Sequence, residues 1–321
     1  MEESSLAPSA RLGRPAVAAG AAQRVGQTWS ERSSDALRYC PARGTVCLAD
    51  CGAAMARVFA SHAHSKPDEL RVMSNELALI VPAAGRGSRF SRFGAVAPKP
   101  LIELEGRPFV WWAVESVRRQ VKLRQLIFVV LQEHIADFAI DQQIKSYWPD
   151  ATIVSLAEVT SGAAETAEMG LNALTAPGPV AINDCDHAFV CDSLPGAVSA
   201  LQAGSMEAVL MCFRSTNPAY SYARIGPGGE VTGTAEKQVI SPFAIAGCYL
   251  FGSAERFKAL YQYYRESCPY DELFVSGMFN LLVERGLPAG MIEVDAHCSF
   301  GTPEELQAVT PQAFAPYRAW K

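Results

Sequence analysis

The chain has 321 residues, of which 49% are hydrophobic and 19% charged, and its formal net charge is -5. That length allows one large domain or two ordinary ones, and the acidic balance excludes a nucleic-acid binder, whose partner requires a basic face. No apolar run reaches the roughly 18 residues needed to span a bilayer, and the N-terminus shows no apolar core of a secretory signal. We therefore expect a cytoplasmic protein with neither a membrane nor a nucleic-acid partner.

Residues 1–72 differ from the rest of the chain, because they are rich in Ala, Arg, Ser and Gly and show no sustained helical or strand period. Such a segment buries too little apolar surface to offset its ordering entropy, so we predict a disordered N-terminal extension. The strong pattern begins near residue 77, and we place the working domain at 73–321. A further hypothesis is that residues 1–72 are an over-called start and that the working protein begins at Met73, which detection of Glu2 or Glu3 in the intact mass of the native protein would contradict.

From residue 77 onward, strand-like apolar runs alternate with helix-like segments. Strands are expected at 77–82, 126–131, 152–156, 179–183, 208–213, 245–251 and 291–294. Helices are expected at 110–119, 134–147, 164–174, 194–202, 254–264, 272–284 and 303–308. A hairpin over 219–236, with a Gly-Pro-Gly-Gly turn at 226–229, interrupts this order. The pattern predicts an α/β fold with βαβ crossovers, a mostly parallel sheet and an inserted β-hairpin.

The nine cysteines are scattered along the chain. Cys212 and Cys248 lie in apolar, strand-like runs, which favours buried free thiols over a disulfide framework. The spacing of Cys40, Cys47 and Cys51 matches no usual zinc pattern, so we expect no zinc site there.

A glycine turn follows the first predicted strand and has the sequence Ala83-Ala84-Gly85-Arg86-Gly87-Ser88-Arg89. Ligands in open α/β sheets bind where strands end, and glycines let backbone N–H groups approach phosphate oxygens closely. The turn is neither a Walker A loop nor a dinucleotide fingerprint, because no Gly-Lys-Ser/Thr follows and Phe90 replaces the third glycine. Arg89, and Lys99 between two prolines, add cations at fixed distance. Together these features predict a polyphosphate site.

Three stretches resemble the signature of the nucleotidyltransferase superfamily, specifically sugar-1-phosphate nucleotidyltransferases (NDP-sugar pyrophosphorylases) of the capsular type. They are 82–89, 98–102 and Leu104-x-Gly106-x-Pro108, and the resemblance extends over about 77–308. It implies a GT-A-like, Rossmann-type three-layer sandwich and transfer from a nucleoside triphosphate to a phosphorylated acceptor, with Mg2+ and release of pyrophosphate. It also implies that the loop 83–89 holds the triphosphate, Arg89 contacts the leaving pyrophosphate, and Lys99 lies near the α-phosphate or the incoming phosphate.

A second turn, 160–166, leads into the helix expected at 164–174. Read alone, this turn is equally well a helix cap. The resemblance implies that Gly162 and Thr166 lie against the nucleobase, although the pattern does not name the base.

Two carboxylates, Asp184 and Asp186, follow the strand expected at 179–183. Mg2+ prefers a few carboxylates together with phosphate oxygens, so either residue is a candidate ligand. A turn cap is the alternative for Asp184. The resemblance favours Asp186 as the metal ligand, with Asp184 as the second candidate, and we expect His187 to pack locally.

The acceptor site is expected after the hairpin. Glu236, Lys237 and Gly247 resemble the family's Glu-Lys element and the glycine-bearing strand that receive the sugar phosphate, and Glu272 resembles its acidic helix at the acceptor pocket. Read without the resemblance, Glu236 and Lys237 are a solvated hairpin end, and Glu272 is as well explained by a surface position. In many relatives an Asp is a second metal ligand where this chain has Ser299, so a two-ligand Mg2+ site is in doubt.

The predicted chemistry is in-line attack by an acceptor phosphate oxygen on the α-phosphorus, with charge neutralised by Arg89, Lys99, the loop amides and Mg2+. The leading acceptor is a sugar 1-phosphate for capsular polysaccharide, and the alternative is phosphocholine or another small phosphorylated alcohol or amide, with CTP. A GT-A glycosyltransferase stays open because 184–186 reads as Asp-x-Asp, and a non-catalytic nucleotide-binding regulator stays open because of Ser299. The oligomeric state, including a homo-oligomer, is not readable.

Overall fold

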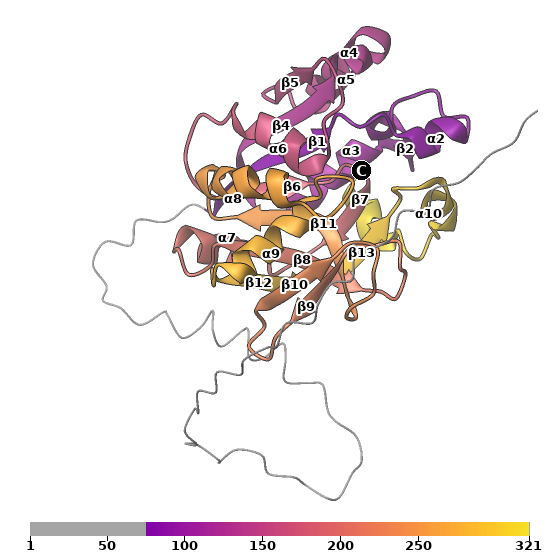
Figure 1. Cartoon of the computed structure of the whole chain (residues 1–321). Coiled ribbons are helices and arrows are strands. Elements are labelled where there is room, and N and C mark those ends of the chain that lie inside the picture. Colours follow the sequence, from indigo (N-terminus) through magenta and orange to yellow (C-terminus); the bar gives the residue numbers. More distant parts are fainter. Residues whose placement is uncertain (1–74, 321) are drawn as a thin grey trace, which may run out of the picture. The chain divides into compact units, whose positions relative to one another are not determined.

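A nine-stranded sheet organises residues 75–320, the part of the chain that the computed structural model describes (Figure 1). Its parallel part has the order β6-β1-β4-β5, and the strands are β1 (Glu76–Ala83), β4 (Lys122–Leu131), β5 (Thr152–Leu156) and β6 (Val180–Asn183). β11 (Phe243–Phe251) runs antiparallel to β6 and continues the sheet beyond its parallel part. It pairs with β8 (Ala208–Arg214), which in turn pairs with β12 (Ala289–Glu293). It also pairs with the predicted hairpin, which consists of β9 (Tyr222–Ile225) and β10 (Val231–Ala235). Two small antiparallel sheets pair β2 (Glu103–Leu104) with β3 (Arg107–Pro108), and β7 (His187–Val190) with β13 (Ala296–Ser299).

Helices cover both faces of the sheet, so the three-layer α/β sandwich expected from the sequence is confirmed. One face packs against α3 (Phe109–Arg118), α5 (Ile140–Tyr147) and α7 (Leu194–Gln202). The other face packs against α6 (Ala163–Leu171), α8 (Ala254–Ser267) and α9 (Met278–Glu284). Shorter helices connect these elements: α2 (Ser88–Arg92), α4 (Gln132–Phe138), α10 (Pro303–Ala308), and the 3-10 helices η2 (Lys99–Leu101), η3 (Val275–Gly277) and η4 (Ala315–Trp320).

β1 shows why the central strands read as continuous apolar runs. Its alternate residues point to opposite faces, so Leu79 and Val81 enter one core cluster while Ala78 and Ile80 enter the other. Because helices cover both faces, Leu77 to Val81 are all buried and polar alternation is absent.

Two predicted helices are interrupted. The segment 134–147 forms α4 and α5, which are separated by Ala139 in a left-handed conformation with φ +49°. The segment 272–284 becomes helical only at η3, because the backbone of Leu273 instead bonds to Ser161 and Ala164 in another loop. The pairing of β7 with β13 was not anticipated either, since each strand has only four residues.

Several sequence expectations concern residues that the structure does not describe: the extension at 1–72, the start at Met73 and the cysteines before residue 75. Within residues 75–320, Cys212 and Cys248 are buried free thiols, as expected. No helix in that part of the chain has the length and apolar character that crossing a membrane requires.

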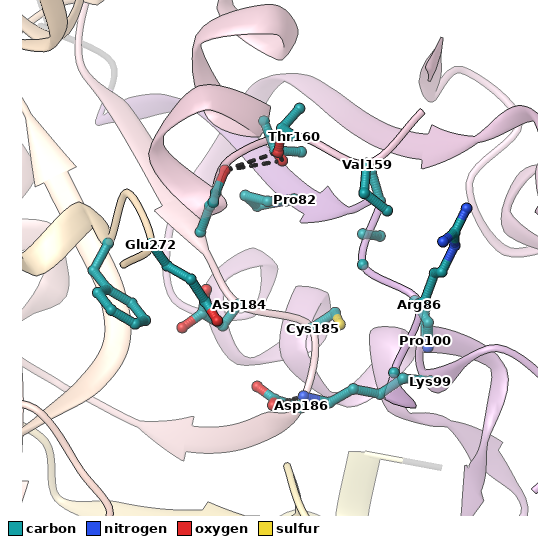
Figure 2. Close-up of a pocket in the computed structure, with 18 of the residues that line it drawn as sticks. Pro82, Arg86, Lys99, Pro100, Val159, Thr160, Asp184, Cys185, Asp186 and Glu272 are labelled. Atoms are coloured by element: carbon teal, nitrogen blue, oxygen red, sulfur yellow. Dashed lines mark hydrogen bonds and ion pairs between the residues drawn. The ribbon is translucent and has the colours of Figure 1, made fainter. Parts of the chain in front are cut away.

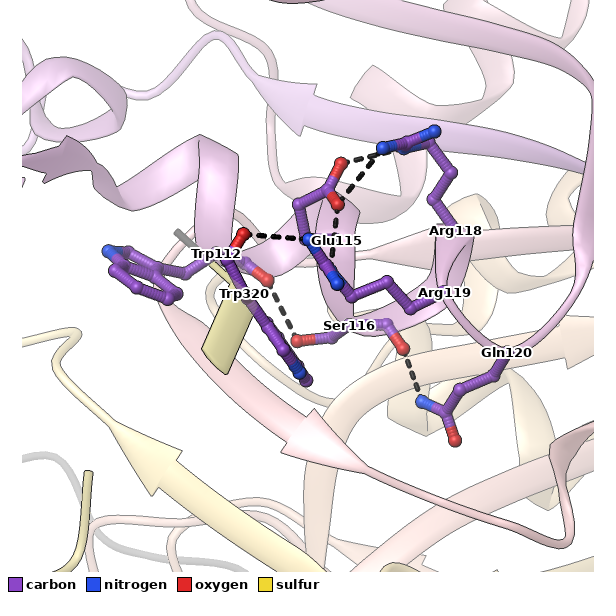
Figure 3. A network of polar contacts seen from close by, with 7 residues as sticks. All are labelled: Trp112, Glu115, Ser116, Arg118, Arg119, Gln120 and Trp320. Carbon is purple, nitrogen blue, oxygen red and sulfur yellow. Dashed lines mark hydrogen bonds and ion pairs between the residues drawn. The ribbon is translucent and has the colours of Figure 1, made fainter. Parts of the chain in front are cut away.

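A polar network on α3 holds the C-terminal segment in place (Figure 3). Glu115, with 2% of its side chain exposed, pairs with Arg118 (2.6 Å) and Arg119 (2.9 Å). Arg119 also donates a hydrogen bond to the Trp320 carbonyl at 2.7 Å and lies over the Trp320 ring. The buried carboxylate of Glu115 is therefore paired. Through Arg119 the same network attaches η4 to α3.

The same helix also fixes β7, the strand that follows the two predicted metal ligands. The Ser116 hydroxyl accepts a hydrogen bond from the Phe189 N–H at 2.9 Å, and the Gln120 side-chain oxygen accepts one from the Cys191 N–H at 2.6 Å. Asn183, at the end of β6, donates to the Ala113 carbonyl at 3.0 Å. Both ends of the loop between β6 and β7 are thus anchored to α3.

Two helical glycines should respond oppositely to substitution by alanine. A Cβ at Gly170 in α6 would lie 2.8 Å from methyl groups of Ile80 and Val129, whereas a Cβ at Gly196 in α7 would meet nothing within 4 Å. We expect Gly170→Ala to lower the free energy of unfolding by about 1–3 kcal/mol through overpacking. Gly196→Ala should raise it by about 0.5–1 kcal/mol through helix propensity. Urea denaturation of both variants checks this, and equal effects would contradict the close contact of α6 with the sheet.

Candidate active site

Two cavities meet at the edge of the sheet where β1 and β6 end. The larger has a volume of about 630 Å³ and the smaller about 310 Å³. Five residues line both cavities: Lys99, Asp184, Asp186, Glu272 and Phe274. A ligand in one cavity would therefore lie beside a ligand in the other.

The larger cavity, shown in Figure 2, collects most residues predicted to bind the nucleotide. These lining residues are Ala83, Ala84, Gly85, Gly87, Gly162 and Thr166. The glycine turn connects β1 to α2, and Gly87 precedes the helix with φ +60°. Ser88 is the exception, because it begins α2 and is not among the lining residues.

The wall opposite the glycine turn consists of the 160–166 turn and the segment before η3. The Leu273 N–H donates to the Ser161 carbonyl at 2.9 Å, and the Ala164 N–H donates to the Leu273 carbonyl at 2.9 Å. The Thr160 and Thr166 hydroxyls lie 2.6 Å apart where this turn enters α6. These bonds bring Glu272 and Phe274 to the cavity, so Glu272 lies in a bend before η3 and not on the predicted helix.

Lys99 and Asp186 form an ion pair at the junction of the cavities. Burial acts to lower the pKa of Lys99, but the charge of Asp186, its hydrogen bond to Lys99 and the neighbouring Cys185 and Asp184 together outweigh burial and raise it. Burial likewise acts to raise the pKa of Asp186, but the charge and hydrogen bond of Lys99, with His187 and a backbone hydrogen bond, together outweigh burial, so the pKa of Asp186 falls below its usual range. Burial, together with the charge of Asp186, raises the pKa of Asp184 well above its usual range. The junction therefore contains one ionised ion pair and one carboxyl that tends to stay protonated.

The donor set fits a Mg2+ ion that shares its coordination with substrate. Within residues 75–320, no group of three or more His, Cys, Asp or Glu side chains is arranged to hold a metal ion. Mg2+ is commonly held by one or two carboxylates plus phosphate oxygens and water, and Asp184 and Asp186 offer that pair beside the glycine turn. Burial and then the charge of Asp186 raise the pKa of Asp184, and a divalent cation would stabilise its ionised form.

The position where many relatives have a second metal-binding Asp is occupied by Ser299, as the sequence indicated. Ser299, on β13, lines the smaller cavity. Asp295, four residues earlier, instead accepts a hydrogen bond from the Asp192 N–H at 2.7 Å and is absent from the lining of both cavities. Asp295 therefore stabilises the loop after β7 and does not line the cavities that hold the candidate metal ligands.

The smaller cavity collects the residues predicted to bind the acceptor, which are Glu236, Lys237, Gly247 and Glu272. Glu236 accepts a hydrogen bond from the Ser276 hydroxyl. Lys237 has a left-handed backbone with φ +52°, and its ammonium lies 5.6 Å from the centre of the Phe274 ring. A left-handed lysine is uncommon and is often found where a binding site holds the backbone.

Gly247 allows β11 to pass close to the metal-ligand candidates. Its φ is +70°, and a Cβ there would lie 2.6 Å from the His187 ring and 2.9 Å from an Asp184 carboxylate oxygen. The Gly247 carbonyl also accepts a hydrogen bond from the Asp184 N–H at 2.9 Å. A larger residue would therefore displace the groups at the junction.

An aromatic wall of the smaller cavity was not found from the sequence. The Phe213 ring stacks on His297 at 3.9 Å and contacts Tyr220 edge-on at 5.2 Å. Burial lowers the pKa of His297 to about 3 and that of His187 to about 4, so both imidazoles are neutral. His187 shares a hydrogen bond with Asn183 at 3.0 Å, in agreement with local packing. These residues lie on separate elements, with Phe213 on β8, Tyr220 in the turn before β9, His187 on β7 and His297 on β13, and the only sequence signal was the i, i+2 spacing of His297 and Ser299.

The two arginines of the glycine turn occupy different positions. Arg89 is exposed and lines the smaller cavity, whereas Arg86 lines the larger one and pairs with Glu133 at 3.2 Å. The sequence argument assigned the polyphosphate to Arg89 and gave Arg86 no role. The resemblance pointed to Arg89. Nothing in the local sequence indicated which of the two cavities each arginine would line.

Solved structures with similar folds support this architecture. A nucleoside-diphosphate-sugar pyrophosphorylase from Vibrio cholerae RC9 matches with a TM-score of 0.62 and 23% identity, over 72% of this chain and 98% of that one. The inositol-1-phosphate CTP transferase from T. maritima matches with a TM-score of 0.58 and 13% identity, over 75% of this chain and 94% of that one. At these identities the similarity establishes the fold.

A short segment is also similar to a curated enzyme. It is 47% identical over 58 residues to 2-C-methyl-D-erythritol 4-phosphate cytidylyltransferase from Frankia casuarinae. The match spans 18% of this chain and 21% of that enzyme, so it covers about a fifth of the relative's length.

The match to a family extends much further along the chain. The model of the MobA-like NTP transferase domain matches residues 79–266, which is more than half of the chain and includes the glycine turn, Lys99 and both aspartates. The nucleotidyltransferase resemblance inferred from the sequence is thereby confirmed. The chain belongs to the MobA-like NTP transferase domain family and is a nucleotidyltransferase.

Proposed function

We propose that this enzyme transfers a nucleoside monophosphate from a nucleoside triphosphate to a phosphorylated small molecule and releases pyrophosphate. The observation that carries the proposal is the meeting of two cavities at Lys99, Asp184 and Asp186. In-line displacement requires the nucleotide and the acceptor phosphate to be held side by side in a fixed orientation.

Each group at the junction has a role in this proposal. The amides of the 83–88 loop bind the triphosphate, and Lys99 neutralises charge at the α-phosphate. Arg89 and Lys237, which line the smaller cavity, bind the acceptor phosphate or the leaving group. No general base is needed, because a phosphate oxygen is already ionised near pH 7, and charge neutralisation by fixed groups supplies most of the rate.

Asp186 and Asp184 are the residues that would hold Mg2+. When bound, the ion would supply positive charge to the phosphate oxygens. Lys99 keeps Asp186 ionised and therefore ready to coordinate.

A sugar 1-phosphate is the acceptor that we favour, on the basis of the whole-domain similarity to an NDP-sugar pyrophosphorylase. A small phosphorylated alcohol with CTP is the second candidate. It is favoured by the 58-residue similarity to a cytidylyltransferase and by the fold match to a CTP transferase for inositol 1-phosphate.

A pyrophosphate-release screen tests the proposal. Each of the four NTPs is combined with sugar 1-phosphates, inositol 1-phosphate, methylerythritol 4-phosphate and phosphocholine, with and without MgCl2. Release with one pair supports transfer and names the acceptor. Turnover of a sugar nucleotide without pyrophosphate release would indicate a glycosyltransferase. Nucleotide binding without turnover across the panel would indicate a regulatory protein.

Removing either Lys99 at the junction or Arg89 in the smaller cavity should impair turnover. We expect Lys99→Ala or Arg89→Ala to lower kcat by about 100-fold or more, the scale of losing one preorganised donor. The matched control is Lys122→Ala, because Lys122 is an exposed cation paired with Glu76 at the opposite end of β1. Steady-state pyrophosphate release with the identified substrates measures the effect, and near-normal turnover in both Lys99→Ala and Arg89→Ala would refute the assignment.

Crowding at Gly247 should impair use of the acceptor more than nucleotide binding. We expect Gly247→Ala to lower kcat/KM for the acceptor on the order of 100-fold, because displacing Asp184 and His187 misaligns the reacting groups. NTP affinity, measured by calorimetry, should change little. Gly252→Ala, just beyond the same strand, makes only ordinary contacts and serves as the control. Equal loss in the two variants would show a general folding defect.

A further inference from the structure

Arg86 stands between the two glycines of the phosphate-binding turn, and its side chain lines the larger cavity (Figure 2). Its side chain is 65% exposed, so it is able to change position without disturbing the core. Among the described residues that line this cavity, Arg86 and Lys99 are the basic ones.

The charge balance of the larger cavity makes Arg86 important. Four acidic side chains also line the cavity: Asp184, Asp186, Asp271 and Glu272. Lys99 is already paired with Asp186, so its charge is largely compensated. A triphosphate, which carries several negative charges, therefore needs another cation, and Arg86 is the remaining basic side chain in the lining.

The present partner of Arg86 is Glu133, at the start of α4. β1 and β4 are parallel neighbours, with Ala83 opposite Val130, so the segments that follow them lie side by side. The Arg86 Nε lies 3.2 Å from a Glu133 carboxylate oxygen, and the Glu133 side chain is 45% exposed. An exposed pair of this kind is weak and exchanges readily, and a guanidinium offers further N–H donors for phosphate oxygens.

We propose that Arg86 is a polyphosphate-binding residue and that Glu133 is its resting partner. When the β- and γ-phosphates of the nucleotide enter the cavity, the Arg86 guanidinium exchanges the Glu133 carboxylate for phosphate oxygens. Glu133 thus competes with the polyphosphate for the same cation. This inference rests on the proposed function, because it assumes that the larger cavity receives the triphosphate.

Inorganic pyrophosphate tests the exchange independently of the nucleobase and the acceptor. Calorimetric titration of the full-length protein with pyrophosphate and MgCl2 should show binding that weakens about 10-fold or more in Arg86→Ala, the scale of losing a charge-assisted hydrogen bond. Arg86→Lys should fall between the two, because it keeps the charge and loses the planar fork. Glu133→Gln should bind pyrophosphate about 2- to 5-fold more tightly, the scale of an exposed ion pair.

The double variant separates competition from an unrelated structural effect. If Glu133 acts through Arg86, Arg86→Ala combined with Glu133→Gln should bind pyrophosphate as Arg86→Ala alone does. Arg214→Ala is the matched control, because the Arg214–Glu293 pair has similar exposure, 61% and 41%, and lies outside both cavities. Its pyrophosphate affinity should equal that of the wild type, and thermal melting verifies that all variants fold.

The outcomes distinguish this inference from the proposed function. If the wild type binds pyrophosphate and Lys99→Ala weakens binding, but Arg86→Ala binds within 2-fold of the wild type, the role of Arg86 is wrong while the proposed function stands. A gain from Glu133→Gln that persists without Arg86 likewise overturns the competition. If the wild type binds neither pyrophosphate nor any of the four NTPs, the proposed function fails and this inference fails with it.

Discussion

The Lys99–Asp186 ion pair is the interaction on which the organisation of the site depends. It joins the segment after β1 to the loop after β6, and both residues line both cavities. Removing two charges from water costs about as much as their attraction returns, so such a pair is a poor source of stability. The pair fixes an ammonium and an ionised carboxylate at one point, which is what the proposed phosphoryl transfer requires.

The rest of the fold keeps those two residues in place. Ser116 on α3 and Gln120 just after it bond to the backbone of β7 and its end, and Asn183 at the end of β6 bonds to α3. The loop that carries Asp184 and Asp186 is therefore held at both ends. On its other side, Gly247 lets β11 approach within contact of Asp184. The buried polar bonds of α3 therefore position the site as well as stabilise the core.

Patterns within single segments could be predicted from the sequence, and contacts between distant segments could not. The buried run of β1 and the capping box of Thr302 and Glu305 each depend on a few neighbouring residues, and both are present in the structure. The non-helical backbone at Leu273 depends on carbonyl and amide groups more than a hundred residues away, so helical propensity misled the prediction there. The separation of Arg86 from Arg89 likewise depends on Glu133, which only the parallel pairing of β1 with β4 brings near.

The acidic character of the larger cavity imposes a further constraint on its substrate. A site lined by four carboxyl groups and two cations repels a bare polyphosphate, even when Asp184 is protonated. The repulsion falls if the substrate arrives with a divalent counter-ion, which the paired carboxylates of Asp184 and Asp186 attract. It falls again if Arg86 leaves Glu133, because that exchange adds one positive charge to the polyphosphate without removing one from Lys99. Under the two proposals above, the cavity would therefore favour a polyphosphate that arrives with a metal over a bare monophosphate.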